Sequence, residues 1–245
     1  MKPPSQHSSV VSRVLHVLTC VARAGRPIGA KQIAAGVDAP LSTVYRHLAA
    51  LKEWGLLQEH AQSGLFEPGP TGVQLAWGFD QNSLLINHSR EALADLMQRT
   101  GESVGLMVPI DDQVVCLSMV ETEQPLRCSF TRGRGHPLTR GASAKALLAF
   151  LPADRAEAVI TAQVGDAAMA QALRAQLVDI REKRYAISAN EVDDGIWGVS
   201  APLISDAGRL EGTITLMAPL GRLTGREIEI ARLTRATADR ISVRL

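Results

Sequence analysis

The sequence predicts an α+β protein with a small helical domain at its N-terminus and a larger domain built on an antiparallel sheet. The chain has 245 residues, which is enough for two domains of ordinary size. Apolar residues recur at helical spacing in its first third, and the pattern changes to the alternation of half-buried strands after residue 102. Hydrophobic residues make up 46% and charged residues 21% of the chain, a balance that excludes disordered, collagenous and coiled-coil proteins.

Simple features exclude further classes of protein. The apolar runs fall far short of the roughly 20 residues needed to cross a bilayer, so we expect no membrane span. Residues 1–9 lack the apolar core of a secretory signal, and we expect them to form a disordered lead-in. Because the cysteines Cys20, Cys116 and Cys128 are odd in number and widely spaced, we expect neither disulfides nor a zinc site, and a cytoplasmic location.

Two helices are predicted at the start of the first domain, which we place at residues 10–70. Apolar residues three and four apart favour a helix over 10–24, which Gly25 ends. A short second helix fits residues 30–36, where Gly36 is suited to a left-handed capping position.

A third helix and a hairpin complete this domain. The helix follows Pro40, has Ser42 as its N-cap and ends at Gly55. Its inward-facing residues share helical spacing and are Leu41, Val44, Leu48 and Leu51. Two short extended runs, 56–60 and 65–69, then flank a Ser-Gly turn. Three short helices with a tight turn between the second and third, followed by a hairpin, predict a winged helix-turn-helix.

Positive charge is concentrated in this domain, although the net charge of the whole chain is only +1. Between residues 13 and 52 there are six basic side chains and one acidic side chain, Asp38. The basic residues are Arg13, Arg23, Arg26, Lys31, Arg46 and Lys52. Because lysine and arginine neutralise DNA phosphates, this asymmetry favours a nucleic-acid face; a solvated basic surface is the alternative.

The first turn and a half of the third helix carries the candidate base-reading residues. Opposite its apolar stripe, the helix presents Ser42, Thr43 and Arg46 outward, with Tyr45 at the flank. We expect Arg46 to bind the O6 and N7 atoms of a guanine, and the other three to hydrogen-bond phosphate or a nearby base. Further DNA contacts are expected from the second helix, the end of the third helix and the wing, at Lys31, Lys52, His60 and Ser63; Gln62 also belongs to the wing.

Residues 71–101 are predicted to be linker helices, and residues 102–245 to form the second domain. Alternating apolar residues predict strands at 104–108, 114–120, 126–130, 199–204 and 210–217. Helices are expected over 143–151, 152–163 and 169–185, and a final helix from Thr224, with Glu227 completing a capping box. Consecutive hairpin strands with helices gathered elsewhere predict an α+β domain.

The sequence contains no motif that identifies an enzyme. The histidines are scattered without the i, i+4 pairing of a metal site, and the Gly-rich stretch 133–135 lacks the third glycine of a dinucleotide fingerprint, so we expect no metal and no cofactor. Cys116 and Cys128 lie on predicted adjacent strands. They form either a thiol centre that acts on a small oxidised metabolite or inert parts of the core.

Six fragments in order make the chain resemble the IclR-type bacterial transcription regulators. They include LSTVYRHL at 41–48 and ASAKALLA at 142–149. The other fragments lie at 12–15, 53–57, 100–104 and 191–203, so that the resemblance covers nearly the whole chain from Ser9 to Leu245.

The resemblance implies a winged helix-turn-helix, a linker helix and a GAF-like effector domain. It also implies a regulator without catalytic activity, with repression as the expected mode, that binds a palindromic double-stranded DNA operator as a homodimer or homotetramer. A small-molecule effector, commonly an organic acid or an aromatic compound in this family, would alter operator affinity. A thiol-dependent enzyme and a protein-interaction module are the alternative interpretations.

The resemblance also locates a candidate effector pocket. In family members that bind small keto acids, four positions carry, in chain order, Asp, then Cys or Ser, then Ser, then Ser. At these positions this chain has Ser188, Gly198, Thr215 and Met217. Only Thr215 keeps the hydroxyl chemistry. We therefore expect a roomier, more apolar pocket that binds a larger effector such as an aromatic compound, or a pocket that has lost its ligand. Trp197 either lines this pocket or belongs to the core.

Overall fold

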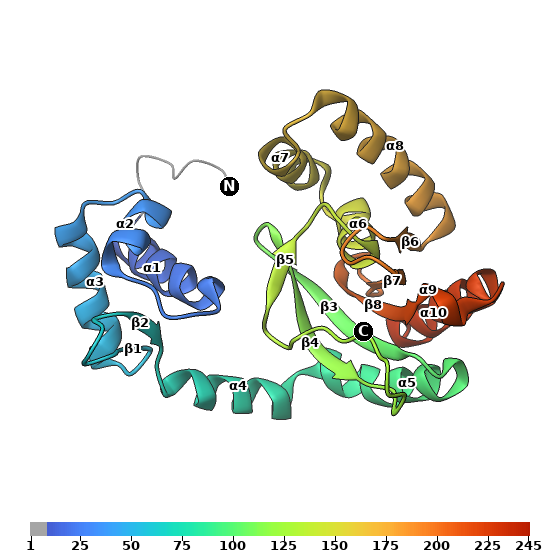
Figure 1. Ribbon diagram of the computed structural model, residues 1–245, viewed down its shortest axis with the longest axis horizontal. Coiled ribbons are helices and arrows are strands. Elements are labelled where there is room, and N and C mark those ends of the chain that lie inside the picture. The colour runs from blue at the N-terminus through green and yellow to red at the C-terminus, as the bar shows by residue number, and fades with distance from the viewer. Residues whose placement is uncertain (1–8) are drawn as a thin grey trace. The chain divides into compact units, whose positions relative to one another are not determined.

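The computed structural model describes residues 9–245, which divide into two compact units (Figure 1). The smaller unit ends at Ser83 and the larger unit comprises Leu84–Leu245. The lead-in predicted over residues 1–9 lies outside the described residues except for Ser9. The hydroxyl of Ser9 accepts a hydrogen bond from the Ser12 amide (3.1 Å) and caps the first helix. In the described part of the chain, no helix is both long and apolar enough to cross a membrane.

The smaller unit contains three packed helices followed by a hairpin. Its elements are α1 (Val10–Ala24), α2 (Ala30–Val37), α3 (Leu41–Glu53), β1 (Leu57–Glu59), β2 (Phe66–Pro68) and α4 (Thr71–Asn82). The two strands pair antiparallel, and Ile28 forms an isolated bridge with Phe66. One core contains Val17, Val21, Ile28, Ala30, Ile33, Val44, Leu48, Leu51, Leu57 and Phe66. The predicted winged helix-turn-helix is confirmed.

The ends of α2 and α3 differ from the predictions. α2 continues past Gly36, and Asp38 rather than Gly36 takes the left-handed conformation, with φ of 49°. Gly36 instead allows α1 and α2 to pack closely, because a β-carbon there would lie 2.9 Å from the Cys20 sulfur. α3 begins at Leu41 with Pro40 as its N-cap, two residues earlier than a helix capped by Ser42 would. Ser42 therefore lies inside the helix, and Leu41 is exposed rather than inward.

The predicted linker contains two helices that differ in burial. α4 (Thr71–Asn82) belongs to the smaller unit and buries none of its residues. α5 (Leu84–Thr100) belongs to the larger unit and buries a stripe formed by Ile86, Ser89, Leu93, Leu96 and Thr100. The helical spacing in the sequence therefore corresponds to a core-facing side on α5. On α4, no apolar side chain is buried by the rest of the smaller unit.

The larger unit is built on a six-stranded antiparallel sheet in the order β5-β4-β3-β8-β7-β6. The strands are β3 (Ser103–Ile110), β4 (Gln113–Val120), β5 (Gly135–Pro137), β6 (Ala186–Ala189), β7 (Ile196–Ile204) and β8 (Leu210–Pro219). The remaining helices are α6 (Ala142–Phe150), α7 (Ala153–Gln163), α8 (Ala167–Lys183), α9 (Leu220–Leu223) and α10 (Glu227–Ser242).

Helices cover both faces of this sheet (Figure 1). The first core lies between the sheet and α6, α7 and α8, and it includes Met107, Leu147, Leu148, Ile160 and Leu177. The second core lies between the sheet and α5 and α10, and it includes Leu96, Leu106, Val199, Leu216 and Ile230. Met107 and Leu106 are neighbours that enter different cores, as the alternation of a strand requires. The predicted α+β architecture is confirmed.

The edges of the sheet differ from the predictions. Residues 126–130, predicted as a strand from their alternation, are irregular and pair with no strand of the sheet. Arg127 and Ser129 both donate hydrogen bonds to Glu121. Cys128 is therefore not on a strand next to Cys116. The short strands β5 and β6 were not predicted.

The predicted capping box of the last helix is also wrong. α10 begins at Glu227, so Glu227 is its first residue and not its third. Thr224 lies at the end of the short helix α9 in a left-handed conformation, with φ of 43°, and Gly225 follows it with φ of 79°. The chain therefore turns between α9 and α10 at the position where a single helix start was expected.

Candidate nucleic-acid interface and ligand pocket

The outward side of α3 carries the four residues predicted to read bases. Ser42, Tyr45 and Arg46 are exposed and Thr43 is half-buried. The opposite side of the helix is anchored in the core by Val44, which is fully buried. These four side chains therefore share one accessible surface at the start of the helix, which is where the recognition helix of this motif contacts base edges.

A buried histidine that was not among the predicted site residues lies beneath this surface. His47 is 3% exposed, and its Nε2 atom has no hydrogen-bond partner in the described part of the chain. Burial lowers the pKa of His47, and the nearby charges of Arg46 and Arg13 lower it further. The imidazole is therefore neutral at physiological pH. Its position three residues after Val44, on the inward stripe, is the sequence signal that could have identified it.

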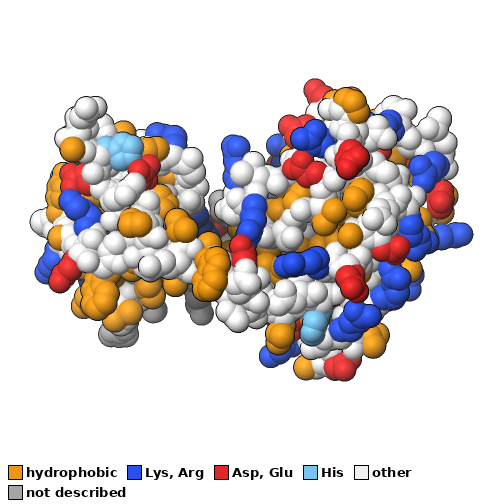
Figure 2. Space-filling view, turned by 90° about the horizontal axis from the view of Figure 1, so that it is seen from below, with side chains coloured by type: hydrophobic (Ala, Val, Ile, Leu, Met, Phe, Trp, Pro, Cys, Tyr) orange, Lys and Arg blue, Asp and Glu red, His pale blue; other side chains and the backbone are white. Residues whose placement is uncertain are grey.

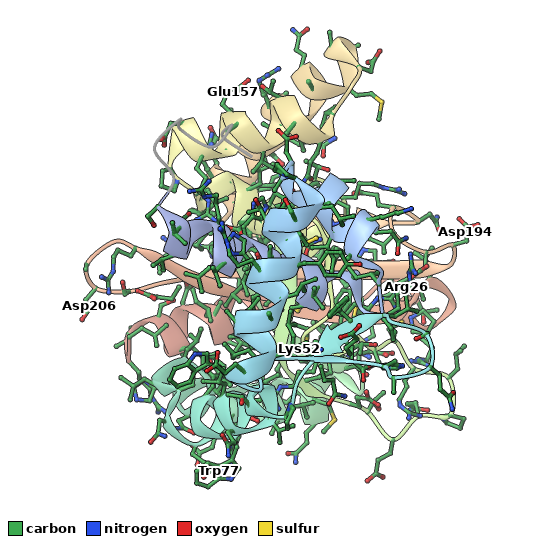
Figure 3. All side chains as sticks on the ribbon, turned by 90° about the vertical axis from the view of Figure 1, so that its left-hand side faces the viewer. Arg26, Lys52, Trp77, Glu157, Asp194 and Asp206 are labelled. Atoms are coloured by element: carbon green, nitrogen blue, oxygen red, sulfur yellow. The ribbon has the colours of Figure 1, made fainter. Side chains whose placement is uncertain are left out.

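Lys31 and Lys52, predicted to contact the DNA backbone, are both exposed. Lys52, at the end of α3 (Figure 3), donates a hydrogen bond to Glu59 on β1, and its ammonium lies 6.0 Å from the centre of the Phe66 ring. Lys31 has no such acidic partner among the described residues. Part of the positive charge of Lys52 is therefore balanced within the chain.

The hairpin residues predicted to form the wing lie at and beside its turn. Ser63 is exposed in the turn, whereas the Nε2 atom of His60 lies 2.7 Å from a carboxylate oxygen of Glu67. Gln58 donates a second hydrogen bond to Glu67 (2.6 Å), and these two hydrogen bonds lower the pKa of that carboxyl group. His60 is therefore held against the opposite strand, and Ser63 is the freer of the two side chains.

The larger unit contains a pocket of about 800 Å³ on the α6 side of the sheet. Ser188, Gly198, Thr215 and Met217, the four residues named from the resemblance, all line it. Strand pairing brings them together, because Ser188 pairs with Gly198 and Gly198 pairs with Met217 across β6, β7 and β8. Trp197 does not line the pocket. It faces the other side of β7 and is 3% exposed in the second core.

The start of α6 and the loop after β6 form one end of this pocket. The Ala142 amide donates to the Ser188 hydroxyl (3.0 Å), and the Gly141 amide donates to a carboxylate oxygen of Glu191 (3.1 Å). The other oxygen of Glu191 accepts a hydrogen bond from Lys145 (2.5 Å), whose side chain is 6% exposed. Lys145 and Glu191 belong to the family fragments at 142–149 and 191–203, but only the structure reveals that they pair.

Two aromatic rings form another wall. Phe130 and His136 stack with ring centres 5.4 Å apart and an angle of 9° between their planes. Burial lowers the pKa of His136, so the ring is neutral, and its Nε2 atom lies 3.4 Å from the Ser143 hydroxyl. This wall was not predicted, because Phe130 was expected on a strand and lies instead in an irregular segment.

The two cysteines proposed as an alternative reactive centre do not have the properties of reactive thiols. Burial raises the pKa of Cys116 to about 11, and burial also raises the pKa of Cys128. Both thiols therefore stay protonated at physiological pH, whereas a nucleophilic cysteine needs a lowered pKa. No group of three or more potential metal ligands occurs in residues 9–245.

Two family profiles match this chain. The bacterial transcriptional regulator IclR C-terminal domain matches residues 81–243, and the IclR helix-turn-helix domain matches residues 10–61. The chain belongs to the IclR family. It is a transcription regulator with a helix-turn-helix DNA-binding domain, and the thiol-dependent enzyme is excluded because the family and its relatives are regulators and not enzymes.

Curated relatives support membership of the IclR family. The chain is 28% identical to the probable transcriptional regulator SauR of Cupriavidus necator over 227 residues, 90% of each chain. It is 30% identical to the regulator BhcR of Paracoccus denitrificans over 223 residues, 87% of this chain and 78% of the relative. It is 24% identical to the transcriptional repressor AllR of Escherichia coli over 249 residues, 97% of this chain and 90% of the relative.

Solved structures of IclR regulators share the fold. A putative IclR regulator from Silicibacter has a TM-score of 0.84 at 22% identity, and the match covers 96% of this chain and 95% of that one. An IclR homologue from Microbacterium hydrocarbonoxydans, solved in complex with 4-hydroxybenzoate, has a TM-score of 0.71 at 20% identity, with 97% and 99% coverage.

Proposed function

We propose that this IclR-family protein is a cytoplasmic, effector-responsive repressor that binds a palindromic operator as a homodimer or homotetramer. The observation that supports sequence-specific binding most strongly is the exposed start of α3, where Ser42, Tyr45 and Arg46 project from a helix whose other side is buried. Repression as the mode of action follows the relatives named AllR, which are repressors.

In this proposal Arg46 recognises a guanine in the major groove. An arginine can donate two hydrogen bonds to guanine O6 and N7, which no other base edge accepts in the same way. Ser42, Thr43 and Tyr45 hydrogen-bond phosphate or a neighbouring base, and Lys31 and Lys52 approach the phosphate backbone. His60 and Ser63 contact DNA from the wing.

The apolar surface of α4 supports assembly into a homo-oligomer. Val73 and Trp77 project from one side of the helix and Leu75 and Phe79 from the other, with exposed fractions between 46% and 73%. The Trp77 ring extends from the helix into solvent in Figure 3, and Figure 2 shows hydrophobic side chains on the surface of this unit. Large exposed apolar side chains on both sides of one helix are characteristic of an interface with a second molecule. A two-fold symmetric dimer would present two α3 helices to a palindrome.

The pocket of the larger unit is the proposed effector site. A volume of about 800 Å³ is ample for a drug-sized molecule and much larger than a two- or three-carbon acid requires. Gly198 and Met217 give it an apolar floor. The IclR homologue solved with 4-hydroxybenzoate provides an example of an aromatic ligand on the same fold. Coupling of about 1 to 3 kcal/mol between effector and operator would change operator affinity about 5- to 150-fold.

Selection of bound fragments from random duplex DNA tests the proposal. The purified chain is expected to enrich a palindrome whose half-sites lie about one helical turn apart, each with a guanine important for binding. Enrichment of an asymmetric site would contradict the symmetric assembly. Failure to retain duplex DNA at low ionic strength would overturn the assignment of α3 as a DNA-reading helix.

A further inference from the structure

We propose that Arg222 is a positioning residue that ties one wall of the pocket to the end of α5, and that movement of this wall reaches the DNA-binding unit through this tie. The inference rests on the proposed role of the pocket as the effector site. It goes further by naming the contacts through which a change in the pocket would reach α5.

The wall concerned is residues 123–131, called the wall segment below. Residues 127–131 line the pocket, although they pair with no strand of the sheet. The side chains of Arg127 and Ser129 bond to Glu121, just before the segment, and so do not attach it to another element. In the described part of the chain, the hydrogen bond that joins the wall segment to a distant element is the one that the Leu126 carbonyl oxygen accepts from Arg222 (2.5 Å).

Arg222, on α9, bonds to this carbonyl oxygen and to a buried carboxylate at the same time. Its Nε atom and one Nη atom donate to the two carboxylate oxygens of Glu102, each at 2.7 Å, while its other Nη atom donates to Leu126. Glu102 is 6% exposed. Two parallel hydrogen bonds hold the planar guanidinium in one orientation, so the direction of its third donor, toward the wall segment, is fixed as well.

Glu102 lies at the junction between α5 and β3. Its amide donates to the hydroxyl of Thr100 (3.3 Å), which itself donates to the carbonyl oxygen of Leu96 within α5 (2.7 Å). At its other end, α5 is separated from α4 of the DNA-binding unit by Ser83 alone. A displacement of Glu102 would therefore act on the last turn of a helix that is joined directly to that unit.

Arg222 and Glu102 lie close to the pocket although neither lines it. Ser103, next to Glu102, pairs with the pocket residue Met217 across β3 and β8. Their charges also act on the pocket residue Cys128. Burial raises the pKa of its thiol, the charge of Glu102 raises this pKa further, and the charge of Arg222 lowers it. The link between pocket and α5 is therefore short.

The two sides of the link differ in strength. Separating Arg222 from Glu102 would leave a buried carboxylate without its counter-ion, so the pair stays together. The single hydrogen bond to Leu126 costs less to break. The wall segment can therefore take two arrangements, one bonded to Arg222 and one released. A ligand that contacts the segment and prefers one arrangement shifts the balance between them.

Hydrogen–deuterium exchange of the full chain, followed by mass spectrometry, tests the link without any ligand. Arg222→Lys keeps the charge beside Glu102, but its single terminal nitrogen cannot reproduce the fork that reaches Leu126. Amides of the wall segment are expected to exchange at least tenfold faster in this variant, while those of α6 and α8 keep their rates. Arg209→Lys, at an arginine that pairs with Glu211 in the same unit, is the matched control. Unchanged exchange of the wall segment, or equal acceleration throughout the larger unit, would overturn the inference.

The same measurement with operator DNA tests whether the link reaches the DNA-binding unit. Coupling between two sites is reciprocal, so operator binding must affect the pocket if the pocket affects operator binding. A saturating duplex recovered by the selection above is expected to change exchange of the wall segment at least twofold in the wild type and not in Arg222→Lys. No change in the saturated wild type, or the same change in both chains, would contradict transmission through Arg222.

A second variant breaks the link at its other end and leaves the ion pair intact. Thr100→Val has nearly the same shape but loses the hydroxyl that joins the Glu102 amide to α5. In the free chain, exchange of the wall segment is expected to match the wild type, whereas the change induced by the operator is lost. A folded Thr100→Val chain that keeps this change would overturn the route through the end of α5.

Failure of this inference and failure of the proposed function give different results. If the wild type retains no duplex, the DNA-reading role fails, and the comparison of free chains still decides whether Arg222 holds the wall segment. If the wild type binds its operator and the variants exchange as it does, only the role of Arg222 is wrong.

Discussion

At the scale of single residues, the start of α3 combines an exposed arginine with a buried histidine. Arg46 projects into solvent, and its neighbour His47 is buried in the core. The helical repeat separates consecutive residues by about 100°, which allows one to contact a partner while the next anchors the helix. The proposed base-reading residue and a buried residue of the helix are therefore adjacent in the chain, and each can be tested separately.

Arg46→Ala is expected to weaken operator binding by about 1 to 3 kcal/mol and to relax the preference at one base pair, because the two hydrogen bonds to guanine are lost. Binding of the variant to operators with each base at that position is the measurement. Arg232→Ala, at an exposed position on α10, is the matched control for the loss of one positive charge. Unchanged base preference in Arg46→Ala would show that this side chain does not read sequence.

The stability of the smaller unit is expected to fall as the pH drops below His47's ordinary pKa of 6.5. Because burial lowers the folded-state pKa of His47, the unfolded chain takes up its proton first on acidification. The stabilisation is complete above pH 6.5 and is lost as the pH falls toward the lowered folded-state value. Urea denaturation at pH 7.5 and 5.5 measures the difference, which His47→Leu should reduce. A variant with the same pH dependence as the wild type would exclude His47 as the cause.

At the scale of elements, hydrogen bonds join the residues that follow α3 to the residues that follow the hairpin. Gly69 donates to the carbonyl oxygen of Leu56 (2.8 Å), and Thr71 donates to that of Gly55 (3.1 Å) and, through its hydroxyl, to that of Trp54 (2.8 Å). These bonds join the end of α3 to the start of α4 around the hairpin. The orientation of the wing relative to the recognition helix therefore depends on this junction.

Gly69→Ala is expected to destabilise the smaller unit by about 1 to 3 kcal/mol, because a β-carbon there would lie 2.2 Å from the Gly55 carbonyl oxygen and the backbone must move. Gly78→Ala, in the open middle of α4, has nothing within 4 Å of the new β-carbon and should stabilise by about 0.5 to 1 kcal/mol through helix propensity. Thermal unfolding of both variants checks the contrast. Equal melting temperatures would mean that the junction relaxes freely.

At the scale of the whole molecule, DNA binding and self-association are expected to depend on each other. A single recognition helix reads few base pairs, so high affinity requires two of them fixed at the spacing of the half-sites. The apolar residues of α4 are the proposed means of holding two copies together. Loss of association should therefore reduce operator affinity without any change in α3.

Val73→Glu with Trp77→Glu is expected to weaken self-association at least tenfold, because it places charge on the proposed apolar interface. Both side chains are about 70% exposed, so the fold should be retained. Analytical ultracentrifugation measures the assembly, and DNA titration measures the accompanying loss of operator affinity. Ile228→Glu, at an exposed apolar position on α10, is the control. A wild-type chain that remains monomeric while it binds its operator would refute the role of α4.

The sequence by itself determined the winged helix-turn-helix, the longer strands of the sheet and the outward position of Arg46. Each of these features follows from the spacing of apolar residues within a single helix or strand, which can be read directly from the sequence. The resemblance to the family also named Ser188, Gly198, Thr215 and Met217, which strand pairing then brought into one pocket.

Only the tertiary structure decided that residues 126–130 form a loop, that Trp197 packs in the core and that Glu191 occupies the start of α6 beside Lys145. An alternating segment becomes a strand only if a neighbouring edge accepts its hydrogen bonds, and no strand of the sheet pairs with residues 126–130. Glu191 and Lys145 are 46 residues apart. Their pairing depends on how the sheet and α6 pack, and no local pattern of side chains contains that information.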